Sequence, residues 1–272
     1  MGLSNLIDGK PLMARKHQSQ QKKRNARRAQ DTHEGLHRQA EAYEAMHQQK
    51  ERIDTRPIEP QNDAQRRYIN AISHFQLTFA TGPAGTGKTW LAAALAAAAL
   101  KDGRIEKVII TRPAVEAGEN LGFLPGEIED KFDPFLQPFK DVLNERLGKS
   151  HVEYLIRAGR IEAAPLAYMR GRTFKNAIVI LDEAQNTTPT QMKMFLTRIG
   201  EGTKVIVNGD LAQKDVRGES GLEDAVARLS FIPAVKHVRF TSRDIVRSGL
   251  VQEIVSAYDA PKPSNEPLPL AA

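Results

Sequence analysis

The sequence contains no cysteine, a single tryptophan and only 6% aromatic residues. Without cysteine the chain has no disulfide framework, no zinc ribbon and no thiol nucleophile. A run of eleven apolar residues, Trp90–Leu100, is shorter than the about twenty residues that a bilayer-spanning helix needs. We expect this run to form a helix buried against a sheet. No apolar stretch after the first methionine resembles a signal peptide, so we expect a cytoplasmic protein with no membrane partner.

The positive charge of the chain is concentrated near its N-terminus. The formal net charge is +6 over 272 residues, and residues 1–56 hold twelve Lys or Arg against seven Asp or Glu. Seven of these bases occur with no acid among them: Arg15, Lys16, Lys22, Lys23, Arg24, Arg27 and Arg28. No apolar stripe in residues 1–56 is wide enough to pack a core. We therefore expect a polar, basic arm, helical or disordered, that binds a polyanion such as nucleic acid.

Residues 57–259 alternate between short β-branched runs and helical runs. This order predicts one α/β domain of three layers with a mostly parallel sheet buried on both faces. Thr188 and Pro189 predict the start of a helix that continues to Gly200. Residues 260–272 carry four prolines and are expected to be a disordered tail. Strands are predicted at Gln76–Thr81, Lys107–Thr111, Ile161–Pro165, Ala177–Leu181, Lys204–Asn208 and Val235–Phe240.

One short segment fits a phosphate-binding loop, G-x-x-x-x-G-K-[ST], at every fixed position. It consists of Gly82, Pro83, Ala84, Gly85, Thr86, Gly87, Lys88 and Thr89. Glycines let consecutive backbone N–H groups turn inward around an anion, and the following helix directs its positive end to the same place. Lys88 would reach the β- and γ-phosphates, and the Thr89 hydroxyl would bind Mg²⁺. ATP and Mg²⁺ are therefore the expected cofactors.

Two further strands end in polar residues that suit hydrolysis. Asp182 and Glu183 directly follow an apolar strand, which brings both carboxylates to the edge of the sheet beside the phosphate loop. We expect Asp182 to hold Mg²⁺ and Glu183 to orient or deprotonate the attacking water. Gln213 follows the next strand and is expected to sense the γ-phosphate or to position the water.

Upstream of the loop, Gln65 could read an adenine base, because an amide both donates and accepts hydrogen bonds. An ordinary helix start at Asn62–Gln65 is an equally good interpretation. The order of the phosphate loop, D-E-A-Q and G-D-x-x-Q resembles the first motor domain of superfamily 1 helicases.

Three longer segments resemble the phosphate-starvation-inducible PhoH family: Thr111–Phe139, Arg170–Gly200 and Asp244–Tyr258. The resemblance covers about residues 57–259 and implies a RecA-like ATP-binding domain, ATPase activity and a link to RNA. The sequence departs from the family at Ser248, where a histidine is usual, so no histidine can act there. The basic arm also lies outside the resemblance.

Two functions remain open at this point. The chain could be an ATP-driven motor or remodeller of nucleic acid, with RNA favoured, or an ATP-switched assembly protein that does not unwind. It contains one motor domain, so translocation would need a homo-oligomeric ring, for which a hexamer is the candidate. Nucleic acid would bind the basic arm or the pore of that ring.

An open nucleotide edge would also need an arginine from a neighbouring subunit to complete it. Arg247 is the first candidate for this catalytic arginine, and Arg243 is the second. The acidic segment Pro113–Phe139 is expected to be a subunit interface or, equally, a packed surface insertion, because an acidic loop binds phosphate backbones poorly.

Overall fold

The computed structural model describes residues 53–113, 128–216, 218–246, 249 and 253–254, and it describes the side chains of the 128–147 helix from residue 136 onward. These residues belong to one compact unit, Arg52–Ala272. Residues 1–52 of the basic arm, the tail 260–272 and residues 114–127 of the acidic segment lie outside the described residues. In the part of the chain that is described, no helix is both long and apolar enough to cross a membrane.

The predicted parallel sheet is confirmed. Its six strands are paired in the order β3-β2-β4-β5-β1-β6, and every pairing is parallel. Each predicted strand matches an observed one to within one residue at either end. The strands are β1 (Leu77–Thr81), β2 (Lys107–Arg112), β3 (Ile161–Pro165), β4 (Ala177–Leu181), β5 (Lys204–Gly209) and β6 (Val235–Arg239).

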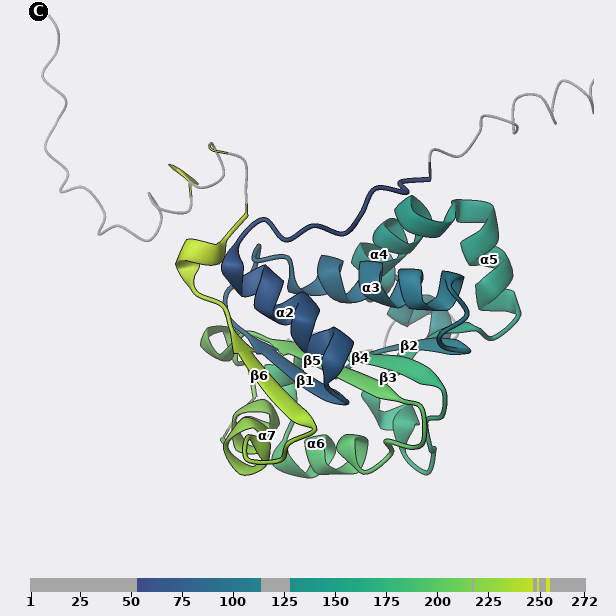
Figure 1. The fold of residues 1–272 in the computed structure, drawn as a ribbon. Helices are drawn as coiled ribbons and strands as arrows, with labels where there is room; N and C mark the ends of the chain where they lie inside the picture. Colours follow the sequence, from purple (N-terminus) through teal and green to yellow (C-terminus); the bar gives the residue numbers. More distant parts are fainter. Residues whose placement is uncertain (1–52, 114–127, 217, 247–248, 250–252, 255–272) are drawn as a thin grey trace, which may run out of the picture. The chain divides into compact units, whose positions relative to one another are not determined.

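Helices cover both faces of the sheet (Figure 1). One face carries α2 (Asp63–His74), α3 (Lys88–Lys101), α4 (Ile128–Leu147) and α5 (Lys149–Arg157). The other face carries α6 (Pro189–Leu196) and α7 (Gly221–Leu229). Alternate residues of each strand enter the two cores: in β4, Ile178 and Ile180 pack with the first helix layer, whereas Val179 and Leu181 pack with the second. This explains why β4, which lies inside the sheet, is apolar at every position.

The order of the strands changes direction at β1. From β1 the chain crosses over β5 and β4 to reach β2, and it later returns to place β6 on the opposite side of β1. In an open parallel sheet such a reversal leaves a crevice at the carboxyl ends of the strands, where ligands bind. The phosphate loop follows β1 directly, so it lies at this crevice.

The helix that follows Thr188 is shorter than predicted. The capping box is present, since Thr188 Oγ1 accepts from the Gln191 backbone N–H and Gln191 Oε1 accepts from the Thr188 N–H. The helix nevertheless ends at Leu196, so the prediction that it runs to Gly200 was wrong. Ile199 instead forms a parallel bridge with Phe174. A Cβ at Gly200 would lie 2.3 Å from the Phe174 carbonyl oxygen, so this glycine permits a close backbone approach and not a helix cap.

The two prolines of Arg56–Pro60 predict a linker into the domain. In the structure this segment is bonded to the domain at Arg56 and through the residues just before it. The Asp54 backbone N–H donates to the Glu145 carbonyl at 2.7 Å. Arg146 of α4 donates to the Arg56 carbonyl at 2.8 Å and lies 3.7 Å from the Asp54 carboxylate. These bonds fix the segment against α4.

Candidate functional site

The loop Gly82–Thr89 has the backbone conformation that its glycines predict. Gly82, Gly85 and Gly87 have φ values of 143°, 80° and 84°, in the region that side chains other than glycine rarely adopt. At Gly82 a Cβ would also lie 2.4 Å from the Phe240 carbonyl oxygen. The loop therefore requires glycine at this position for space as well as for conformation.

Distant parts of the chain hold the loop in this conformation. Gln65 of α2 donates from Nε2 to the Thr86 carbonyl at 3.1 Å. The Val246 N–H donates to the Gly85 carbonyl at 2.9 Å, and the Gly82 N–H donates to the Gly209 carbonyl at 3.1 Å. The loop is thus anchored by α2, by β5 and by the segment that follows β6.

The Lys88 ammonium group lies inside the loop. It donates to the Gly82 carbonyl at 2.6 Å, to the Pro83 carbonyl at 2.8 Å and to Thr86 Oγ1 at 3.3 Å. Burial lowers the pKa of Lys88, and the charge of nearby Asp210 is the largest effect that opposes it. Two carbonyl oxygens and a hydroxyl thus hold a buried ammonium ion in the loop where the motif predicts the phosphates.

Thr89 and Asp182, predicted as the metal ligands, lie together although 93 residues separate them. Thr89 Oγ1 donates to Asp182 Oδ1 at 3.4 Å. Asp182 is only 8% exposed, and burial, together with the charge of Glu183, raises the pKa of its carboxyl to about 6. A divalent cation here would favour the ionised form, and Mg²⁺ commonly binds through one or two protein oxygens plus phosphates and water. The residues therefore fit the predicted magnesium site.

Glu183 is the centre of a polar network at the end of β4. Arg112 of β2 lies 3.1 Å from its Oε1, and Gln185 Nε2 donates to its Oε2 at 2.7 Å. Its backbone φ is 51°, a strained value for a residue with a Cβ that is common at functional sites. The carboxylate is held between two partners at the edge of the sheet, as a positioned base would need.

Gln185 is a residue of the site that the sequence motifs did not identify as functional. It is 1% exposed, and besides Glu183 its Nε2 donates to the Gln213 carbonyl at 3.3 Å. Its Oε1 accepts from the Asp210 N–H at 3.0 Å. This one amide therefore connects the turn after β4 to the turn after β5. Its position in the D-E-A-Q motif was the available signal.

A cleft with a volume of 460 Å³ brings the predicted residues together. We call it the loop cleft. Its lining has one base, Lys88, and five acids, so it would repel a bare anion and accept one that arrives with a divalent cation. The lining includes Ala84, Gly85, Gly87, Lys88, Thr89, Trp90, Asp141, Glu145, Asp182, Glu183, Asp210 and Gln213.

The other predicted residues are placed less directly. Gln65 is buried, and its Oε1 accepts from the Gln61 N–H while its Nε2 bonds the loop, so its observed contacts are structural and adenine reading stays a prediction. Arg247 and Ser248 lie outside the described residues, but Val246 bonds the loop directly. Arg243 is exposed in the turn Ser242–Asp244. Of the acidic segment, Leu136 and Phe139 are buried in the core, which agrees with a packed insertion at that end.

The fold and site together define a P-loop α/β protein. The family model described as "PhoH-like protein" matches residues 57–259, and the chain belongs to this family. Protein PhoH of Escherichia coli (strain K12) is 55% identical over 209 residues, which cover 75% of this chain and 59% of that protein. The PhoH-like protein of Bacillus subtilis (strain 168) is 55% identical over 197 residues, covering 72% and 62%. The chain thus spans about three fifths of the length of these relatives.

Two solved structures share the general arrangement at low similarity. The large terminase of a thermophilic bacteriophage has a TM-score of 0.48 at 13% identity, over 73% of this chain and 50% of that one. The Pif1 helicase of Candida albicans has a TM-score of 0.40 at 17% identity, over 75% and 44%. Likenesses of this degree say nothing of what the present chain does.

The Gln185 network leads to a stability prediction. Gln185→Glu removes the N–H donors of a buried amide and places a carboxylate beside Glu183. We expect the free energy of unfolding in urea at pH 7 to fall by about 1–3 kcal/mol, the usual cost of an unsatisfied buried polar group. Gln213→Glu makes the same change on an exposed side chain and should change stability by less than about 0.5 kcal/mol. Equal effects of the two variants would contradict the proposed network.

Proposed function

We propose that the chain binds and hydrolyses ATP with Mg²⁺ and acts on nucleic acid, RNA in the first place, as a homo-oligomer. The observation that carries the ATPase part is the loop cleft, where Lys88, Thr89, Asp182 and Glu183 meet at one edge of the sheet. Family membership supports the same class of activity. Because the chain spans about three fifths of the length of these relatives, its own residues carry the proposal.

Each residue of the cleft has a separate part in the proposed reaction. The loop N–H groups and Lys88 bind the β- and γ-phosphates, and Thr89 and Asp182 hold the cation. Mg²⁺ would neutralise charge that develops on the phosphate oxygens. Glu183 accepts a proton from the attacking water, and Arg112 and Gln185 keep its carboxylate in place. Gln213, exposed at the rim of the cleft, orients the water or senses the γ-phosphate.

The oligomer enters the proposal through the open side of this cleft. Phosphoryl transfer spreads negative charge over the γ-phosphate oxygens, and an arginine supplied by a neighbour stabilises it. Arg247 directly follows Val246, whose N–H bonds the phosphate loop, so a change at the nucleotide could pass to it through the backbone. A ring of subunits would bring such an arginine to each site.

The alternative function is an ATP-switched assembly protein that does not move along nucleic acid. It shares the ATP site and the oligomer but predicts that RNA leaves the rate of hydrolysis unchanged. The basic arm favours the nucleic-acid reading, because seven bases without an acid attract phosphate backbones.

Substitutions in the loop cleft test the ATPase directly. Lys88→Ala should abolish tight ATP binding in calorimetry, because the phosphates lose their direct cation partner. Glu183→Gln should bind ATP but hydrolyse it about 10²–10⁴-fold more slowly, since an amide cannot accept the proton. Lys101→Ala, at the exposed far end of α3, is the matched control. It should change neither ATP binding nor the rate of hydrolysis. Turnover by Glu183→Gln at the wild-type rate would disprove the assignment.

The proposed action on nucleic acid is tested with the full chain and with a variant of the basic arm. Single-stranded RNA should accelerate ATP hydrolysis, with DNA of the same sequence as the comparison. Changing the seven arm bases to glutamine should weaken RNA binding and flatten the plot of log affinity against log salt by about 0.7 per lost phosphate contact. If RNA does not bind the arm and does not change the rate of ATP hydrolysis, the assembly function is supported instead. If only the slope of log affinity against log salt is unchanged in the arm variant, the arm is a partner-binding segment.

A mixing experiment tests the arginine in trans. Arg247→Ala and Lys88→Ala should each be nearly inactive, since an arginine of this kind is worth about 10³–10⁵ in rate. Mixed oligomers contain sites that pair an intact loop with an intact arginine, so part of the activity should return. A mixture of Lys88→Ala with Glu183→Gln contains no intact site and is the control. If the first mixture stays as inactive as the control although mixed oligomers form, Arg247 does not act across subunits.

A further inference from the structure

A second cleft adjoins the loop cleft and has no part in the chemistry described above. Its volume is 650 Å³, and we call it the side cleft. It shares Gly85, Gly87, Trp90 and Glu145 with the loop cleft, so a ligand can extend from one into the other. Its remaining lining residues are Asp54, Arg56, Pro57, Glu59, Gln61, Gln65, Arg146 and Val246.

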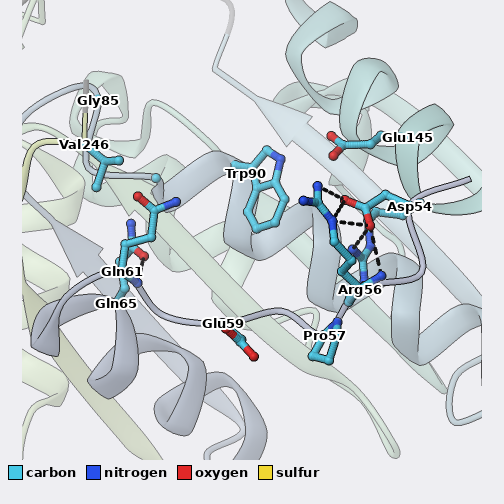
Figure 2. Close-up of a pocket in the computed structure, with 12 residues that line it drawn as sticks. Asp54, Arg56, Pro57, Glu59, Gln61, Gln65, Gly85, Trp90, Glu145 and Val246 are labelled. Atoms are coloured by element: carbon cyan, nitrogen blue, oxygen red, sulfur yellow. Dashed lines mark hydrogen bonds and ion pairs between the residues drawn. The ribbon is translucent and has the colours of Figure 1, made fainter. Parts of the chain in front are cut away.

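Trp90 is the residue at which the two clefts meet. It directly follows Lys88 and Thr89 in the first turn of α3 and lines both clefts. Figure 2 shows its ring in the side cleft, between Gln61 and Gln65 on one side and Asp54 and Arg56 on the other. The side chain is 36% exposed, although the apolar helix around it is largely buried. A large aromatic ring is therefore presented to the space beside the phosphate loop.

The charges of the side cleft exclude a phosphate chain from it. It holds three acids, Asp54, Glu59 and Glu145, against two bases, Arg56 and Arg146. Both bases are engaged, since the Arg56 guanidinium lies 2.7 Å from Asp54 and Arg146 contacts the same carboxylate. The loop cleft, in contrast, contains Lys88 and the N-terminal end of α3, which favours an anion. The uncharged end of a nucleotide suits the side cleft, and its phosphates suit the loop cleft.

The outer wall of the side cleft is fixed in place. It is formed by residues 54–61, which the bonds of Asp54 and Arg56 fasten to α4. At the other end of this stretch the Gln61 N–H donates to Gln65 Oε1 at 2.9 Å. A cleft whose wall is already bonded at both ends needs little ordering when a ligand enters, which favours binding.

Building on the ATPase proposed above, we infer that the side cleft holds the nucleoside part of the nucleotide, with its base stacked on the indole ring of Trp90. Every base has a π-face, so stacking on Trp90 accepts different bases and ranks them by stacking strength, purines before pyrimidines. Gln65 then acts as a positioning residue, because its amide holds the phosphate loop through Thr86 and the cleft wall through Gln61.

The test uses a property of the sequence: Trp90 is the single tryptophan of the chain, so tryptophan fluorescence of the unmodified protein reports on Trp90 alone. Stacking of a base quenches indole emission. Titration with Mg²⁺–ATP should therefore quench the emission along the same curve that calorimetry gives for binding. Tripolyphosphate with the same concentration of Mg²⁺, which can fill the phosphate loop but has no base, should bind with little quenching.

The outcomes separate this inference from the proposed function. If ATP binds in calorimetry and the emission does not change, the stacking is disproved while the ATP site stands. The same holds if tripolyphosphate quenches as strongly as ATP, because the signal then comes from the loop. If ATP does not bind at all, the proposed function fails and this inference fails with it.

Two variants measure the contribution of the ring. Trp90→Ala should weaken ATP binding by about 5- to 150-fold, the range that loss of one base–aromatic stack produces. Trp90→Phe retains a ring and should recover most of that affinity. Both variants should bind tripolyphosphate like the wild type, which also shows that the loop is intact. Equal loss of ATP and tripolyphosphate affinity in Trp90→Ala would assign Trp90 a structural role and overturn the inference.

Discussion

The site depends on one constraint, the anchoring of the phosphate loop to backbone and side chains outside it. Gly82, Gly85 and Gly87 can adopt the positive φ values that the loop conformation needs. Glycines adopt many other backbone conformations as well, so their flexibility does not by itself fix the loop. Bonds from Gln65, Gly209 and Val246 select it. The helix α3 begins at Lys88, and most of its alanine side chains are buried. These small side chains let the helix pack closely against the sheet and its neighbouring helices. The N-terminus of that helix is therefore fixed directly after the phosphate loop.

A second consequence of the fold is the excess of acid around a single lysine. Parallel strands deliver the residues that follow them to one edge, and here β4 and β5 are both followed by acids, Asp182 and Asp210 among them. Burial makes this charge expensive, as the raised pKa of Asp182 indicates. A bound cation and its nucleotide would relieve that cost, which links binding of the metal to binding of the phosphates. The Gln185 amide connects the two acidic turns through its bonds to Glu183 and to Asp210.

Much of this molecule could be predicted without coordinates. The six strands are short and mostly rich in β-branched or apolar residues, and the sequence pattern predicts their limits to within one residue. The phosphate loop is recognisable because its chemistry resides in contiguous residues. For the helix after Thr188 the prediction was only partly right. The residues Thr188 and Pro189 predict its start, but no pattern in the sequence predicts its end at Leu196. Gly200 looks like a helix terminator in the sequence, whereas in the structure it makes room for the carbonyl of Phe174, a residue far back along the chain.

The sequence by itself determined the fold class, the loop and the identity of the acids after β4, because each depends on neighbours along the chain: strand periodicity, glycine spacing and the direction of one strand. Only the tertiary structure decided which distant groups meet. It placed Thr89 against Asp182 and Arg112 against Glu183, and it made residues of the expected linker, Arg56–Pro60, line a cleft together with Trp90. Such contacts arise from strand order and helix packing, and no local pattern in the sequence encodes them.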